Sequence, residues 1–382
     1  MFIISSAKYI LKEHKFIFQN EYIFNFHKIF IKYLSTIYQM FEFQATIISW
    51  YHQNKRNLPW RGTTNPYFIW LSEIILQQTR IEQGTSYYLK FIKHFPTIKD
   101  LALANEQEVL NLWQGLGYYS RARNLHTTAK YIYFDLKGEF PKNFDALILL
   151  KGVGVYTASA IASFAYNESK AVVDGNVYRV LSRVFNIETP IDSGNGKKEF
   201  QNLADELIST EVPNIYNQAI MEFGALHCLP VNPLCENCPL QFSCLSFAAG
   251  TIKIRPMKSK KTKIRPRYFV FKISQDTEGK ISMIKRYKKD IWQNLYQFPL
   301  IEFDSQEKKM AFMGSNNFNY VSKEYKHILS HQHIFATFVF QGVKKINLQQ
   351  GEQKLFPQQI DDFPIPRLIE KFLEEESDQI FS

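Results

Sequence analysis

The four cysteines of this 382-residue chain all lie within one 17-residue stretch. Their spacing is C-x6-C-x2-C-x5-C, formed by Cys228, Cys235, Cys238 and Cys244. Four thiolates at this spacing can converge on one point, whereas disulfides would not need so short a segment. The pattern therefore predicts a metal site, either four-cysteine zinc or a [4Fe–4S] cluster, because spacing alone does not decide between the two. Reduced structural thiols are the alternative.

Two carboxylates are of the types needed to cleave a glycosidic bond. Glu73 lies among large apolar residues, and burial in a closed pocket would raise its pKa and let it donate a proton. Asp174 stands where a helix is expected to begin, and a capping aspartate that accepts backbone N–H bonds stays ionised. One raised and one lowered carboxyl pKa suit an oxocarbenium-like transition state. The alternatives are a solvated helix face shared by Glu73, Gln77 and Arg80, and a purely structural cap at Asp174.

Two glycine turns are suited to contact with DNA. Gly152 and Gly154 stand in a Leu-x-Gly-Val-Gly pattern before a Thr/Ala-rich helix, which predicts a helix–hairpin–helix. Glycine lets the backbone approach a phosphate, and the next helix offers N–H groups at the positive end of its dipole. A related turn at residues 115–117 precedes tyrosines and arginines that suit phosphate contact and base stacking. An ordinary helix–helix turn is the alternative for each.

The elements that carry these residues change in type along the chain. Apolar residues recur at three- and four-residue steps from 41 to about 250, which predicts an all-α domain that contains the cysteine loop, residues 228–244. Residues 251–267 hold eight Lys or Arg and no acid, which indicates a linker that meets a polyanion or, alternatively, a solvated linker. β-rich runs follow, so that residues 268–382 are expected to form a smaller α+β domain with a closing helix at 366–376. Residues 1–40 stay unassigned.

Composition limits the compartment and the partners. The formal net charge of +10 fits a nucleic-acid partner. No apolar run reaches the length of a membrane span. Clustered cysteines that bind metal favour a reducing compartment. We therefore expect a cytoplasmic protein without a membrane partner. The further expectation of a monomer associated with the bacterial nucleoid does not rest on composition.

The stretch from residue 48 to residue 244 resembles the helix–hairpin–helix base-excision glycosylases. Within them it is similar to the adenine DNA glycosylases, the MutY family. The motifs that carry the resemblance are LPWR at 58–61, WLSE at 70–73 with LQQT at 76–79, GLGYY at 115–119, DGNV at 174–177 and the four cysteines. The resemblance implies a multidomain fold, in which an all-α glycosylase domain holds a [4Fe–4S] cluster in its cysteine loop.

The resemblance also implies a role for each matching residue. Glu73 would protonate the leaving adenine at N7, and Asp174 would stabilise the oxocarbenium ion or bond transiently to the sugar carbon. The residues expected to assist near the sugar are Tyr156 and Asn176. The residues expected to form the pocket for the extruded adenine are Trp60, Arg61 and Gln218. The residues expected to enter the duplex around the lesion are Gln78, Thr79 and Tyr118. Core packing is the alternative for Trp60 and Tyr118.

Tyr156 separates two reaction types within this superfamily. In bifunctional relatives such as the thymine-glycol endonucleases, a lysine at this position attacks the sugar, forms a Schiff base and then nicks the strand. Tyrosine cannot form an imine. The sequence therefore predicts a monofunctional glycosylase that leaves an abasic site.

Two segments of the second domain, residues 290–299 and 327–331, resemble the Nudix-like domain that recognises 8-oxoguanine. Ser330 and His331 keep the polar pair of the family's Phe-Ser-His loop, but Leu329 replaces its aromatic residue. A weaker preference for the lesion is one consequence of that change. No catalytic Nudix box follows Phe298, which argues against nucleotide pyrophosphohydrolysis.

These observations predict an enzyme that removes adenine mispaired with 8-oxoguanine or guanine from double-stranded DNA. The alternatives are a glycosylase/lyase for oxidised pyrimidines and a lesion-binding protein without catalysis. A lysine in place of Tyr156 would favour the first, and the presence of both Glu73 and Asp174 argues against the second.

Overall fold

The computed structural model describes residues 40–259 and 264–381. Within this part of the chain two compact units are found. The first unit contains residues 40–55 and 171–257, and the second unit contains residues 56–170 together with the described residues from 258 onward. None of the described helices is long and apolar enough to cross a membrane.

The first unit is helical. Its elements are a helix over residues 40–54, α10 (Gly175–Val184), α11 (Gly194–Leu207), α12 (Pro213–Leu226), η3 (Cys235–Asn237), η4 (Gln241–Ser243), α13 (Leu245–Ala248) and η5 (Ile252–Ile254). The longer helices bury their apolar faces in one core, in which Phe200 and Phe223 are fully enclosed. The cysteine loop follows α12 and consists of short helical turns, so its backbone is shaped by side-chain contacts more than by a regular helix.

The second unit begins with a helical part, residues 56–170. Its elements are α3 (Pro66–Leu76), α4 (Ile81–His94), α5 (Ile98–Leu103), α6 (Glu106–Trp113), α7 (Ser120–Lys130), the π-helical η2 (Tyr131–Asp135), α8 (Phe144–Leu147) and α9 (Val155–Tyr166). Trp70, Phe91 and Trp113 are fully buried in its core. Asn65, Thr97, Asn105 and Asn143 cap the starts of four of these helices through their side chains, as polar residues at an N-cap do.

The second unit continues with a sheet part, residues 265–381. Its elements are β1 (Arg265–Gln275), β2 (Ile281–Lys285), β3 (Tyr296–Gln297), β4 (Leu300–Phe303), α14 (Gln306–Gly314), β5 (Tyr320–Val321), β6 (Tyr325–Ile328), β7 (Gln332–Gly342), β8 (Glu352–Leu355), η6 (Pro357–Asp362), α15 (Arg367–Glu376) and α16 (Asp378–Phe381). These strands form one sheet with the order β3-β2-β1-β7-β5. Its central strands, β1 and β7, run parallel over eleven paired residues.

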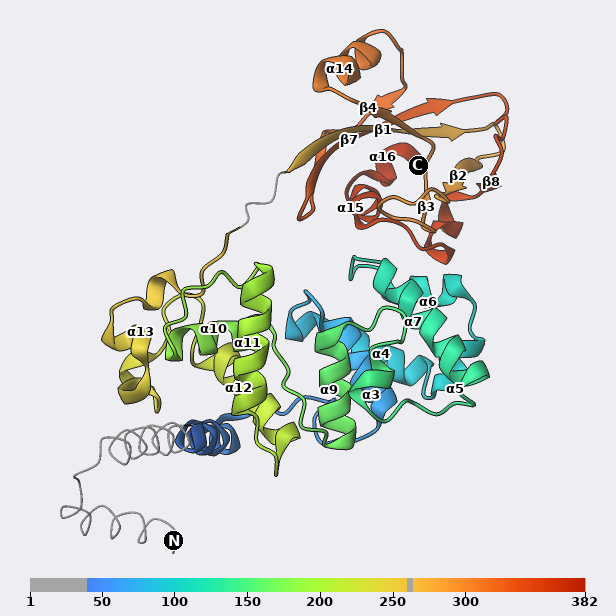
Figure 1. The fold of residues 1–382 in the computed structure, drawn as a ribbon. Coiled ribbons are helices and arrows are strands. Elements are labelled where there is room, and N and C mark those ends of the chain that lie inside the picture. Colours follow the sequence, from blue (N-terminus) through green and yellow to red (C-terminus); the bar gives the residue numbers. More distant parts are fainter. Residues whose placement is uncertain (1–39, 260–263, 382) are drawn as a thin grey trace, which may run out of the picture. The chain divides into compact units, whose positions relative to one another are not determined.

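Helices cover this sheet from two sides, with α14 on one and α15 and α16 on the other (Figure 1). The ring of Phe338 on β7 stacks on Phe372 of α15, with 3.8 Å between the ring centroids. The predicted succession of an all-α domain and a smaller α+β domain is confirmed. The closing helix expected over residues 366–376 is α15, with Pro366 as its N-cap.

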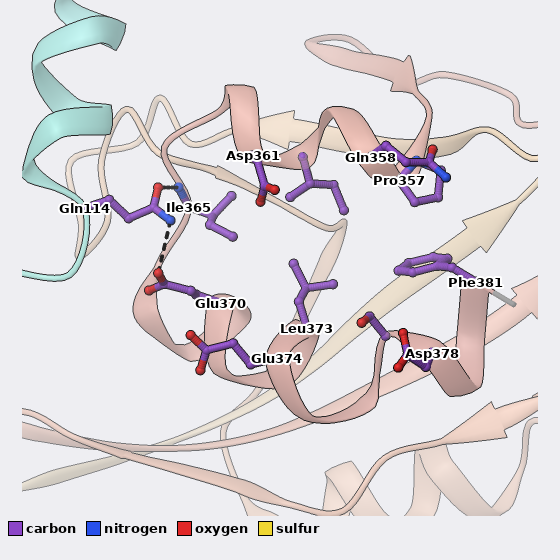
Figure 2. Close-up of a pocket in the computed structure, with 12 residues that line it drawn as sticks. Gln114, Pro357, Gln358, Asp361, Ile365, Glu370, Leu373, Glu374, Asp378 and Phe381 are labelled. Atoms are coloured by element: carbon purple, nitrogen blue, oxygen red, sulfur yellow. Dashed lines mark hydrogen bonds between the residues drawn. The ribbon is translucent and has the colours of Figure 1, made fainter.

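The sheet part is hydrogen-bonded to the helical part of the same unit. Asn294 Nδ2 donates to Glu106 Oε1 at 2.6 Å, and the Arg123 guanidinium donates to the Gln293 carbonyl at 2.7 Å. A groove of about 640 Å³ between Gln114 and the segment from η6 to α16 belongs to the same contact region (Figure 2). Gln114, which follows α6, accepts from the Ile365 N–H and donates to Glu370 Oε1, both at 3.4 Å, so the sheet part also contacts the turn after α6.

Candidate functional site

Glu73 is buried in the interior of α3, with 7% of its surface exposed. The Tyr156 hydroxyl on the first turn of α9 donates a hydrogen bond to Glu73 Oε2 at 2.6 Å. The alternative of a solvated face shared with Arg80 is wrong, because α3 ends at Leu76 and Arg80 instead precedes α4. The structure thus joins two of the sequence-predicted residues, one carboxyl and one phenol, at a buried point.

The turn before α9 brings Tyr156 to this place. Gly152 has a φ of +78°, and a Cβ there would lie 2.6 Å from Asn124 Cβ, so a larger residue would meet both backbone strain and a clash. Thr128 Oγ1 donates to the Lys151 carbonyl at 2.7 Å and fixes the turn to α7. Gly154 is the N-cap of α9 and no side chain caps it. The expected hairpin therefore presents backbone N–H groups at a helix start, as an anion-binding turn does.

Asp174 is the N-cap of α10 and is surrounded by donors. Its Oδ1 accepts from the Val177 N–H at 2.8 Å, and its Oδ2 accepts from Asn176 Nδ2 at 2.8 Å. Burial raises the pKa of the Asp174 carboxyl, while these hydrogen bonds and the nearby Arg179 charge oppose the rise. The expectation of a lowered pKa is wrong, because desolvation outweighs the donors that the cap supplies.

Arg179 links Asn176 to the cysteine loop. Its Nη2 donates to Asn176 Oδ1 and to the Gly224 carbonyl, both at 2.7 Å, and its Nε donates to the Cys228 carbonyl at 2.7 Å. A Cβ on Gly224 would lie 2.7 Å from Asn176 Cβ, so glycine is what allows α12 to approach α10 here. Sequence reasoning missed Arg179, although its position one turn after Asn176 on a helix was a usable signal.

The four cysteines line a single pocket in the first unit, together with Arg183. Arg183 is 2% exposed, and its Nη1 lies within hydrogen-bond distance of Cys228 Sγ at 3.4 Å. Burial first, and the neighbouring cysteines to a smaller extent, raise the pKa of the Cys238 thiol to about 11. Among the described residues, no group of three or more His, Cys, Asp and Glu side chains is arranged so that it could hold a metal ion.

The donor set of this pocket nevertheless fits a cluster of metal ions. Four soft thiols gathered in one pocket repel each other as thiolates, and bound cations remove that repulsion. The buried Arg183 also donates to the carbonyls of Leu229 and Pro230, which fixes the loop around the first cysteine. Arg183 follows Arg179 by four residues, so both guanidinium groups reach the loop from one face of α10.

Gln78 and Tyr118 both occupy turns with unusual backbone geometry in the second unit. Gln78 has a φ of +57° and is exposed, and Thr79 follows it. Tyr118 has a φ of +45° and is 46% exposed, which excludes core packing for its ring. Non-glycine residues at positive φ are uncommon and concentrate at functional sites. Both side chains are therefore presented at the surface by strained turns.

A cavity of about 330 Å³ brings Tyr118 together with the loop between β6 and β7. That loop contributes Leu329, Ser330 and His331, and other segments of the sheet part contribute Trp292 and His327. Two segments more than two hundred residues apart in sequence thus line one cavity. The structure places the sequence-predicted polar pair next to the sequence-predicted aromatic residue.

The three residues expected to hold an extruded base are found in two different units. In the second unit, the Trp60 ring packs edge-on against Tyr88 with 5.5 Å between centroids, a core contact. Arg61 Nη1 in the same unit donates to the Arg56 carbonyl at 3.2 Å. In the first unit, Gln218 Oε1 accepts from the Tyr51 hydroxyl at 2.8 Å. Neither unit by itself brings the three together.

Both the helical part and the sheet part of the sequence are similar to known proteins. A family model described as HhH-GPD superfamily base excision DNA repair protein matches residues 71–209, and a NUDIX domain model matches residues 270–375. The adenine DNA glycosylase of Buchnera aphidicola subsp. Baizongia pistaciae (strain Bp) is 37% identical over 322 residues, which cover 82% of this chain and 89% of that protein. The adenine DNA glycosylase of Homo sapiens is 43% identical over 211 residues, 53% of this chain and 39% of that protein.

Among solved structures, one described as a thermostable thymine-DNA glycosylase aligns with a TM-score of 0.52 and 28% identity. The alignment covers 56% of this chain and 99% of that chain. One family model matches the helical region and the other matches the β-rich region, and the match to the Buchnera aphidicola protein covers most of both chains. The chain belongs to the adenine DNA glycosylase family.

Proposed function

We propose that this chain hydrolyses the N-glycosidic bond of adenine mispaired with 8-oxoguanine or with guanine in double-stranded DNA. Family membership supports the adenine substrate, because the relatives carry that name. The observation that carries the proposal is the 2.6 Å hydrogen bond between the Tyr156 hydroxyl and the buried Glu73 carboxyl. A carboxyl group held in an apolar helix interior is an environment in which a proton can be kept and then donated.

The two carboxylates have complementary roles in this proposal. Glu73 protonates adenine at N7, which turns the base into a neutral leaving group. The Asp174 carboxylate stabilises the oxocarbenium ion or bonds transiently to the sugar carbon, and Asn176 keeps that carboxylate oriented through its 2.8 Å hydrogen bond. Trp60, Arg61 and Gln218 are assigned to the pocket for the base. Extrusion of that base from the duplex costs about a few kcal/mol.

Tyr156 also supports a monofunctional reaction. A phenol cannot form an imine with the sugar, so the strand is not nicked through a Schiff base at this position. The reaction therefore ends with free adenine and an abasic site. The alternative of an endonuclease-type glycosylase/lyase lacks its amine here.

Lesion recognition is assigned to the cavity shared by Tyr118 and the β6–β7 loop. Ser330 and His331 line this cavity and offer hydrogen-bonding groups. Gln78, Thr79 and Tyr118 are assigned to the space that the extruded adenine leaves in the duplex. Pyrophosphohydrolysis is not part of the proposal, since α14 carries a single carboxylate, Glu307, and a Nudix hydrolase needs several.

The four cysteines are assigned to a [4Fe–4S] cluster that orders the loop after α12. Equal amounts of iron and acid-labile sulfide, about four of each per chain, are expected in purified protein. Zinc without sulfide would contradict this part of the proposal. Because the readout is metal content, it is independent of glycosylase activity.

The remaining assignments concern the organisation of the chain. The proposed domains are 41–250 for the glycosylase, 251–267 for a DNA-contacting linker and 268–382 for lesion recognition. Residues 260–263 of that linker and most of the unassigned segment 1–40 lie outside the described residues. Arg267 is not available to DNA, because its guanidinium pairs with Asp290 and Glu302. The enzyme would act as a monomer at the bacterial nucleoid.

The deciding experiment is single-turnover release of adenine from a duplex with one 8-oxoguanine:adenine pair, with products examined before and after alkali. Strand breaks after alkali alone are expected. Breaks without alkali would show lyase activity and overturn the monofunctional assignment. Tight binding with no breaks under either condition would favour a lesion-binding protein.

A further inference from the structure

Arg121 lies between the two turns that present Gln78 and Tyr118. It is half-buried near the start of α7, and its guanidinium donates to protein carbonyls, where the sequence suggested phosphate contact for the arginines after residues 115–117. Its guanidinium contacts both turns at once, although about forty residues separate them in sequence. This double contact is what makes Arg121 informative.

On one side, Arg121 closes the C-terminal end of α3. Its Nη1 donates to the carbonyls of Ile74 at 2.8 Å and Gln77 at 2.6 Å, with Ile75 farther at 3.3 Å. The last carbonyls of a helix have no partner within the helix, and they carry the negative end of its dipole. A guanidinium therefore suits this position, and it fixes the backbone immediately before Gln78.

On the other side, Arg121 holds the turn that leads to Tyr118. Its guanidinium carbon lies 5.6 Å from the centroid of the Tyr118 ring and 5.1 Å from that of Trp113, within cation–π range. Its Nη2 lies 3.5 Å from the Leu116 carbonyl. Trp113 Nε1 also donates to the Gly117 carbonyl at 2.9 Å, so Trp113 contacts both the Arg121 guanidinium and the turn before α7.

The charge of Arg121 is held without a carboxylate partner among the described residues. Burial lowers its pKa to about 10, and Tyr118 is the group that opposes this change. Carbonyl and aromatic partners offset the desolvation cost of a half-buried guanidinium less fully than a carboxylate partner does. Arg121 therefore contributes more to the geometry of the two turns than to the free energy of folding.

We infer that Arg121 is a positioning residue that joins the turn after α3 and the turn before α7 into one rigid wedge, so that Gln78 and Tyr118 enter the duplex together. The inference rests on the proposed function, since it assumes that both side chains enter DNA. It adds Arg121 as a positioning residue, and it adds an energetic coupling between Gln78 and Tyr118 that their separate roles do not include. The guanidinium fork is required, because lysine has one point charge and cannot serve both turns.

The test is a double-mutant cycle on base extrusion. Gln78→Ala, Tyr118→Ala and the double variant are made with Arg121 intact and with Arg121→Lys. Extrusion is followed by the fluorescence of 2-aminopurine placed beside an 8-oxoguanine:adenine pair with a non-hydrolysable sugar. With Arg121 intact, the double variant is expected to lose about as much extrusion as the worse single variant. The reason is that Gln78 and Tyr118 act together, so that loss of either side chain already disables the wedge. With Arg121→Lys, the two losses are expected to add.

Arg121→Lys alone is expected to reduce extrusion about tenfold, since a small misplacement of a positioning group has effects of that size or larger. Duplex affinity is expected to stay within about twofold, as the charge is kept. Lys309→Arg on α14 is the matched control, because it also exchanges one cation for another, and Lys309 is 1% exposed, pairs with Glu324 and lines none of the cavities described above. It should leave extrusion unchanged even if it lowers the melting temperature.

The same coupling in both backgrounds would overturn the inference and leave Arg121 as a structural residue. Arg121→Gln, which keeps amide donors for the carbonyls, replaces the lysine variant if that variant does not fold. Extrusion by the unsubstituted enzyme without any release of adenine from a normal substrate would contradict the proposed function and leave the wedge inference standing.

Discussion

Glu73 and Asp174 are both carboxylates on helices, but the structure holds them in opposite ways. Glu73 stands in the interior of α3 among apolar side chains and accepts a bond from the Tyr156 phenol. Asp174 is the N-cap of α10 and accepts bonds from the Val177 N–H and the Asn176 side-chain amide. The helix interior offers no backbone donors, whereas the helix start offers several.

The difference shows how one chain can hold two carboxyl groups in different surroundings, which suits the proposed roles of one as an acid and the other as an anion. A phenol can donate to a carboxylate or accept from a carboxylic acid, so the Tyr156 contact is compatible with either protonation state of Glu73. The donors around Asp174 favour the anion, yet burial still raises its pKa. In the proposed reaction, burial makes the free Asp174 carboxylate costly, and a cationic sugar beside it would remove that cost, which would favour the transition state over the ground state.

The largest effect is expected when Glu73 is replaced by glutamine. Glu73→Gln keeps the shape of the side chain and its contact with Tyr156 but removes the transferable proton. Single-turnover adenine release should fall on the order of 10³-fold, the range of general acid catalysis. Duplex binding, measured by titration of a labelled oligonucleotide, should persist. Retained turnover would assign the acid elsewhere and break the comparison.

Asp174→Asn should separate catalysis from stability. Asparagine caps a helix about as well as aspartate does, so α10 is kept. The rate should fall about 10²-fold, because a fixed charge at the developing cation is lost. The melting temperature of the DNA-free protein should rise, since a charge that burial disfavours has been removed. A lower melting temperature would show that the anion stabilises the fold, contrary to the direction of its pKa.

The pH dependence of this stability difference has a definite sign. A carboxyl whose pKa is raised by folding adds stability below its unfolded pKa of about 3.9 and loses it as pH rises through the folded value. The advantage of Asp174→Asn should therefore grow as pH rises through that folded pKa. For the unsubstituted enzyme, adenine release should decline about tenfold per pH unit below it, because the anion is required. A flat rate profile down to pH about 4 would contradict the raised pKa.

Much of this comparison was accessible from the sequence. The apolar surroundings of Glu73, the capping position of Asp174 and the glycine turn before Tyr156 are local patterns, and local patterns predict local structure well. The succession of a helical and a β-rich region followed from the change of period after residue 267. Each of these rests on residues that lie close together in the chain.

The rest depended on burial and on contacts between distant residues. The raised pKa of Asp174 could not be foreseen, because a capping pattern reports donors and does not report desolvation. Arg121 contacts carbonyls of α3, and carbonyls leave no trace in side-chain patterns. The end of α3 at Leu76 was missed for a related reason, because a helical period runs on through a turn that holds Gln78 at positive φ.

The smallest effect is expected at Arg179, whose replacement tests whether the Asp174 region depends on the cysteine loop. Arg179→Lys keeps the charge but cannot donate to Asn176, Gly224 and Cys228 together, so Asn176 loses its orientation toward Asp174. Adenine release should fall about tenfold, as expected for the loss of one hydrogen bond to a charged group. The acid limb of the rate profile should move to higher pH, because the carboxylate has lost a well-placed donor. Iron content should not change, and a parallel loss of iron and rate would instead mean that Arg179 only maintains the loop.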